Sequence, residues 1–102
     1  MLTHVVCMRF ADLTPAGEAR DRILAMKGRI PALLDIECGV DIVRSARSYD
    51  LVLITRHADL DGMQAYQVHP VHQETLAWLK QQLLPGGAVS VDFVSARTLS
   101  GS

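Results

Sequence analysis

The segment from Tyr66 to His72 brings together side chains that can carry acid–base chemistry. It reads Tyr-Gln-Val-His-Pro-Val-His and so contains one phenol and two imidazoles. An imidazole, with an unperturbed pKa of about 6.5, can remove a proton at neutral pH, and a phenol can donate a hydrogen bond to a developing oxyanion. His72 and Tyr66 are therefore the candidate catalytic residues. The alternative is structural: a core histidine that ties a helix to a neighbouring strand, beside a half-buried tyrosine.

Pro70 decides how His72 is presented. Proline disfavours a helical conformation at the preceding residue, His69, and fits the first turn of a new helix. We therefore predict a helix over residues 70–84. At about 100° per residue, His72 falls on one inward-facing stripe of that helix, together with Leu76, Leu79 and Leu83.

Three further polar residues are candidate ligand contacts: His4, His69 and Asp92. His4 lies on one face of a predicted strand with Val6 and Met8, so it can face a cavity. Asp92 alternates with its apolar strand neighbours and should point to the side opposite theirs, while His69 either packs at the helix junction or contacts a ligand.

The spacing of these residues does not favour a metal site or a cofactor. His69 and His72 are three residues apart, but no cysteine or glutamate completes a familiar ligand set. The sequence has no glycine-rich phosphate loop and no dinucleotide fingerprint. We expect neither metal nor cofactor. His57 is interpreted as a solvated partner of Asp59.

The composition predicts one globular domain. The chain has 102 residues, of which 49% are hydrophobic and 21% charged, with a formal net charge of −1. This balance gives no support for a nucleic-acid or membrane partner. The two cysteines, Cys7 and Cys38, form no CxxC motif and are expected to be reduced core thiols. A cytoplasmic location is the corresponding expectation.

Hydrophobic periodicity predicts the elements that position these residues. The first helix should start at a Thr14 cap and run to Pro31, with an apolar stripe through Ala19, Ile23, Met26 and Ile30. Pro85-Gly86-Gly87 should end the last helix. The predicted strands are residues 2–10, 36–42, 49–57 and 89–93, and the predicted helices are 14–31, 58–68 and 70–84.

This order predicts an α+β, ferredoxin-like βαββαβ fold with a four-stranded antiparallel sheet. Helices can cover only one face of such a sheet, yet the first and third strands are apolar on both faces. We therefore expect a homodimer in which the two open faces pack into an α/β barrel. The domain should span residues 1–95, followed by a flexible tail at 96–102.

The chain resembles the stress-responsive A/B barrel domain (Dabb) family over about residues 3–93. The resemblance is carried by His4-Val5-Val6-Cys7-Met8-Arg9-Phe10, Ile30-Pro31, Ile36-Glu37-Cys38-Gly39, Tyr49-Asp50-Leu51-Val52-Leu53, the Tyr66–His72 block and Val91-Asp92-Phe93. It implies the ferredoxin-like fold and the dimer. Some plant members are polyketide cyclases with a tyrosine and a histidine spaced as Tyr66 and His72 are, and with a histidine at the position of His4.

In those cyclases, the resemblance implies, the histidine removes a proton next to a carbonyl and the tyrosine stabilises the oxyanion. The present chain departs from them at Leu51, where another polar group would be expected. Two hypotheses follow. The first is a barrel that binds a hydrophobic carbonyl compound and acts on it as a cyclase-like lyase or isomerase. The second is a non-catalytic structural or stress-protective dimer with core histidines.

Overall fold

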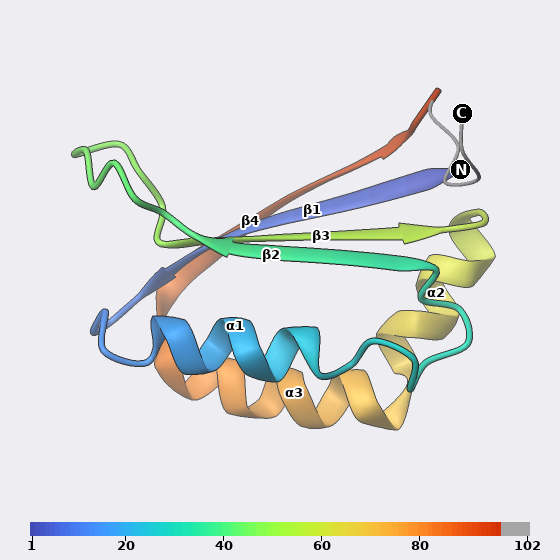
Figure 1. Cartoon of the computed structure of the whole chain (residues 1–102), viewed down its shortest axis with the longest axis horizontal. Coiled ribbons are helices and arrows are strands. Elements are labelled where there is room, and N and C mark those ends of the chain that lie inside the picture. Colours follow the sequence, from blue (N-terminus) through green and yellow to red (C-terminus); the bar gives the residue numbers. More distant parts are fainter. Residues whose placement is uncertain (97–102) are drawn as a thin grey trace.

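The structure, a computed structural model, describes residues 1–96 and consists of four strands and three helices (Figure 1). The tail predicted at 96–102 lies, apart from Ala96, outside the described residues. The elements are β1 Leu2–Phe10, α1 Ala16–Leu24, β2 Asp35–Val40, β3 Leu51–His57, α2 Leu60–Val68, α3 Pro70–Gln82 and β4 Leu83–Val94.

The strands form one antiparallel sheet in the order β2-β3-β1-β4. All three helices lie on the same side of this sheet, as Figure 1 shows, and no helix or strand of residues 1–96 covers the opposite side. The predicted α+β, ferredoxin-like βαββαβ fold is therefore confirmed. No helix of the described chain is long and apolar enough to cross a membrane.

The first helix is shorter than predicted, although its apolar stripe is buried as expected. α1 ends at Leu24, and the chain then continues in turns, with a positive φ of 78° at Gly28. Thr14 does not cap the helix, because its amide and hydroxyl both bind the Asp12 carboxylate. The stripe still reaches the core because the turns carry its last members inward: Ala19, Ile23, Met26 and Ile30 are at most 2% exposed.

The prediction that Pro85-Gly86-Gly87 separates helix from strand was wrong. α3 ends at Gln82, and β4 begins directly at Leu83, which is paired with Phe10. The register then shifts, since Met8 is opposite Ala88, so the Pro-Gly-Gly segment forms a bulge inside the strand. Gly87 is required there: a β-carbon would lie 2.7 Å from the carbonyl oxygens of Arg9 and Leu84.

The sheet face without helices is largely apolar. On β1 and β3 it presents partly buried residues that include Val5, Cys7, Val52 and Ile54. The edge strand β4 contributes the exposed side chains Val89, Val91 and Phe93. Cys7 and Cys38 are both free thiols of intermediate exposure, and Cys38 packs against the hydrophobic core.

Candidate functional site

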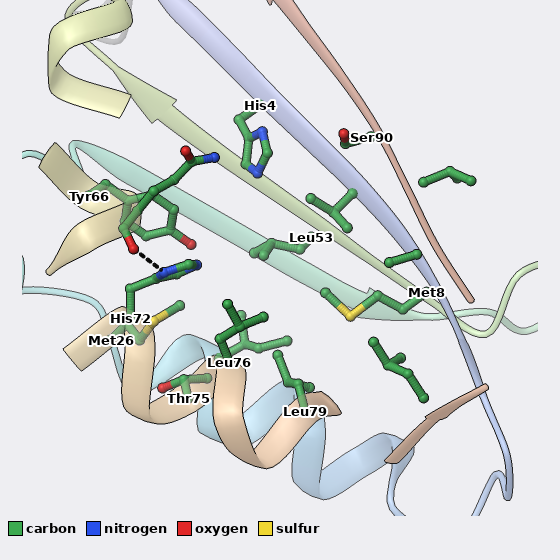
Figure 2. Close-up of a pocket in the computed structure, with 16 residues that line it drawn as sticks. His4, Met8, Met26, Leu53, Tyr66, His72, Thr75, Leu76, Leu79 and Ser90 are labelled. Atoms are coloured by element: carbon green, nitrogen blue, oxygen red, sulfur yellow. Dashed lines mark hydrogen bonds between the residues drawn. The ribbon is translucent and has the colours of Figure 1, made fainter. Parts of the chain in front are cut away.

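A cavity of about 260 Å³ lies between the sheet and helix α3 (Figure 2). Helix α3 forms one wall of the cavity and the edge strand β4 forms another. Most residues of β4 are exposed. Its polar lining residues are His4, Tyr66, Gln67, His72, Thr75 and Ser90, and His4 faces Tyr66 and His72 at the end where α2 meets α3. The rest of the wall is apolar and consists mainly of Val6, Met8, Ile23, Met26, Leu53, Leu76, Leu79 and Leu83.

Tyr66 is the most buried polar side chain of the cavity. It projects from α2, whose first turn is capped by Asp59 accepting from the Gly62 amide at 2.9 Å. The residue is 0% exposed, and its hydroxyl has no hydrogen-bond partner among residues 1–96. Burial raises the pKa of the phenol. Tyr66 is therefore a protonated donor directed into the cavity (Figure 2).

His72 lies beside Tyr66, with the two ring centres 4.5 Å apart. Pro70 starts α3 at its first position, which places His72 in the first turn with its ring toward the sheet. Its Nδ1 donates to the backbone oxygen of Gln67 at 2.8 Å, since a carbonyl oxygen can only accept. Burial lowers the pKa of His72, and nearby His4 lowers it further. The ring is thus neutral at pH 7, with the Nε2 lone pair left for the cavity.

His4 and Asp92 form a second polar unit on the opposite wall. They are paired across β1 and β4, and the His4 Nδ1 bonds the Asp92 carboxylate. His4 is buried, whereas the Asp92 side chain is 38% exposed. Because the carboxylate accepts from Nδ1, the other ring nitrogen, Nε2, remains for a ligand in the cavity. Figure 2 shows the His4 ring projecting from β1 toward Tyr66 and His72.

His57 was interpreted from the sequence as a solvated partner of Asp59, and this was wrong. It is 0% exposed and lies beside the Tyr66 ring, with ring centres 4.9 Å apart. Its Nδ1 donates to the Ala32 oxygen at 2.8 Å, and its Nε2 bonds the Thr55 hydroxyl at 2.9 Å. Burial lowers its pKa. The signal missed in the sequence is strand alternation, which places His57 on the inward face of β3 with Thr55.

His69 is separated from the other candidates. Its side chain caps α3, where Nδ1 accepts from the Val71 amide at 3.1 Å, and it does not line the cavity. The structure thus brings together Tyr66, His72 and His4, with Asp92 behind His4. Among residues 1–96, no three His, Cys, Asp or Glu side chains gather as a metal site would require.

Comparison with known proteins identifies the chain by family rather than by activity. The family model described as "Stress responsive A/B Barrel Domain" matches residues 2–95. No curated protein sequence matches the chain.

Several solved structures share its fold. A dimeric ferredoxin-like protein of unknown function from Thermobifida fusca is 26% identical, with a TM-score of 0.72 over 92% of this chain and 90% of that one. A dimeric ferredoxin-like protein of unknown function from Bacteroides fragilis is 20% identical, with a TM-score of 0.78 over 90% of this chain and 93% of that one. The hydroxynitrile lyase from Passiflora edulis is 13% identical, with a TM-score of 0.73 over 96% and 95% of the two chains.

Proposed function

Since the chain belongs to the stress-responsive A/B barrel domain family, we propose that it forms a homodimer whose subunits bind a hydrophobic carbonyl compound and act on it by acid–base chemistry. The observation that carries this proposal is the Tyr66 hydroxyl, which is buried without a partner at the polar side of an otherwise apolar cavity. Leaving a buried hydroxyl unpaired costs about 1–3 kcal/mol. A ligand oxygen that accepts from this hydroxyl removes the cost.

The cavity favours a small ligand with one apolar portion and one carbonyl group. Its volume of about 260 Å³ is slightly below the roughly 300–1,000 Å³ of typical ligand pockets. That space suits a molecule of one ring with a short chain. The apolar wall would hold the ring, while the carbonyl oxygen would face the Tyr66 hydroxyl.

The chemistry follows from the neighbouring imidazole. His72 is neutral, because burial lowers its pKa, and its Nδ1–H is committed to the Gln67 oxygen. Its Nε2 can therefore remove a proton from the carbon next to the carbonyl, while Tyr66 donates to the oxygen that gains negative charge. General acid–base help of this kind typically contributes about 10²–10⁴-fold. The lyase from Passiflora edulis supports the idea that this fold can carry catalysis.

The homodimer is proposed from the open face of the sheet. Val91 and Phe93 are 64% and 47% exposed there, beside the partly buried residues of β1 and β3. A contiguous exposed apolar patch of this kind marks an interaction site. Structurally similar proteins from Thermobifida fusca and Bacteroides fragilis are described as dimeric. A second copy of this chain, packed sheet to sheet, is the partner that this face fits.

Proton exchange on a model ketone tests the proposed chemistry. Benzoylacetone has one phenyl ring and an acidic methylene between two carbonyls, so it matches the cavity in size and chemistry. We expect the protein to accelerate exchange of its methylene protons in D₂O, followed by proton NMR, above the rate in buffer. His72→Ala should remove the acceleration. Glu74→Ala on the exposed face of α3 is the control and should retain it.

The alternative, a structural dimer with core histidines, is supported by His57, whose two ring nitrogens are both bonded inside the protein. It predicts a different result in the same experiment. If benzoylacetone neither exchanges faster nor raises the melting temperature, the cavity has no carbonyl ligand of this kind and the structural reading is preferred.

A further inference from the structure

The polar side of the cavity contains two imidazoles, and their hydrogen-bond partners differ. His72 is backed by the neutral Gln67 carbonyl, whereas His4 is backed by the Asp92 carboxylate. A carboxylate on Nδ1 fixes the ring orientation and stabilises an imidazolium, as in triad enzymes. A backbone carbonyl fixes the orientation but brings no charge.

We propose that His4, held by Asp92, is the general acid of this site, donating from Nε2 to the carbonyl oxygen while His72 removes the proton from the adjacent carbon. This assignment rests on the function proposed above. His4 is then a catalytic residue, because it touches the reacting oxygen. Asp92 is a positioning residue, because it acts only through His4.

The division of roles agrees with what surrounds each ring. Burial lowers the pKa of His72, the hydrogen bond to the Gln67 oxygen opposes this, and the proximity of His4 lowers the pKa further, which keeps His72 in its basic form. The Asp92 carboxylate holds the His4 ring instead, so the two imidazoles have different environments, as is usual for an acid and a base in one site. The groups that face His4 from the packed elements are Asp92 and Ser90 on β4, Thr55 and His57 on β3, Tyr66 on α2 and His72 on α3. Asp92 is the one carboxylate among them.

The proton transfers balance without any additional reactant. The C–H bond next to the carbonyl breaks, its proton moves to Nε2 of His72, and its electron pair forms the double bond of the enol. The carbonyl oxygen takes the proton from Nε2 of His4 while Tyr66 donates a hydrogen bond to the same oxygen. In D₂O the two rings exchange with solvent, so the reverse reaction returns a deuteron to carbon and regenerates both imidazoles.

The pH profile of benzoylacetone exchange tests this assignment. For the wild type we expect the exchange rate to fall at acidic pH, because His72 must be neutral to remove the proton. Asp92→Asn removes the carboxylate that holds the His4 ring, so it should lower the maximal rate by roughly tenfold while leaving the rise in melting temperature caused by benzoylacetone unchanged. The acid limb, set by His72, should stay in place. Asp92→Glu restores a carboxylate and should recover the wild-type rate.

His4→Gln provides a second variant, because glutamine offers a hydrogen-bond donor but no transferable proton. It should still bind benzoylacetone, as shown by the rise in melting temperature, yet lose about 10²-fold in exchange rate. An Asp92→Asn profile that overlays the wild type would overturn the acid role and leave the proposed function standing. Absence of exchange in the wild type would instead overturn the proposed function.

Discussion

At the scale of single residues, the Tyr66 hydroxyl is where stability and function conflict. The group is buried and has no partner among the described residues. Tyr66→Phe removes the unsatisfied group and keeps the ring between His57 and His72. We expect this variant to be more stable by about 1 kcal/mol in urea denaturation.

The same substitution should reduce benzoylacetone exchange by roughly 10²-fold, because the oxyanion loses its donor. Met63→Leu, a substitution of another buried residue of α2, is the control and should leave the exchange rate near the wild-type value. A Tyr66→Phe protein that is both less stable and fully active would show that the hydroxyl has a structural partner and no ligand.

Two histidines with lowered pKa values, His57 and His72, make folding sensitive to acid. The pKa values of His57 and His72 are lowered in the folded protein, so the unfolded chain binds more protons at acidic pH. Their contribution to stability is present above the unfolded pKa of about 6.5 and is lost as pH falls toward the lower folded values. We expect the free energy of unfolding, from urea titrations, to decrease between pH 7.5 and pH 5.

His57→Gln separates the contribution of His57. Glutamine can occupy the same bonds without titrating, so the variant should be less stable at neutral pH but should lose less stability on acidification. If the free energy of unfolding falls with pH equally steeply in the wild type and the variant, His57 has the same pKa in the folded and the unfolded chain.

The positions of some site residues could be predicted from the sequence, and those of others could not. His72 and His4 could be placed on inward faces because helix and strand periodicity decide orientation. The pairing of His4 with Asp92 could not be foreseen, since it depends on the register between strands separated by most of the chain. His57 was misread because its neighbour Asp59 suggested a surface pair, while the alternation of β3 was the stronger signal.

At the scale of elements, the junction between α2 and α3 explains the role of His69. Pro70 has no amide hydrogen, and the next amide, that of Val71, donates to the His69 ring. His69→Ala removes the cap and should cost about 1 kcal/mol of unfolding free energy. Benzoylacetone exchange should be unchanged, because His69 does not line the cavity.

His69→Asp is the matched variant, since aspartate is a good N-cap residue and should restore the lost stability. If the aspartate variant is fully stable but loses benzoylacetone exchange, His69 contacts the ligand after all.

Element boundaries were predicted well where one residue determines them, as at Asp59 and Pro70. They were predicted poorly where tertiary pairing outweighs local preference. The Pro-Gly-Gly segment resembles a loop locally, but strand pairing of Leu83 with Phe10 draws it into β4 as a bulge.

At the scale of the whole molecule, the open sheet face also has a hollow. The hollow lies between β2 and β3 over Gly39, Val52 and Ile54, while Phe93 stands exposed on β4 at the other side of the sheet. In a dimer with two-fold symmetry both subunits use the same face, so the β4 side of one subunit can meet the β2 side of the other. We therefore expect the dimer to place Phe93 of one subunit near the Gly39 hollow of the other.

Gly39→Val tests this arrangement. A β-carbon at Gly39 meets nothing within 4 Å, so the variant should fold, but its side chain would fill the hollow and weaken the dimer. Gly17→Ala, on α1 and therefore on the helix side, is the control and should remain dimeric. Sedimentation equilibrium distinguishes the outcomes. A wild-type monomer at micromolar concentration would contradict the dimer, and a Gly39→Val dimer of unchanged affinity would contradict the position of Phe93.

The need for a partner could be predicted from the sequence, because strands that are apolar on both faces cannot all be covered by helices on one side. The hollow could not be predicted, since it appears only when Gly39 is paired with Val52.

The most direct test of the account follows the histidine ring signals by NMR while benzoylacetone is added. The four imidazoles occupy distinct places: His4 and His72 line the cavity, His57 lies behind Tyr66, and His69 caps α3. The account predicts that the signals of His4 and His72 shift together and saturate, while those of His69 remain fixed. Shifts confined to His69, or no shift at any ligand concentration, would contradict it.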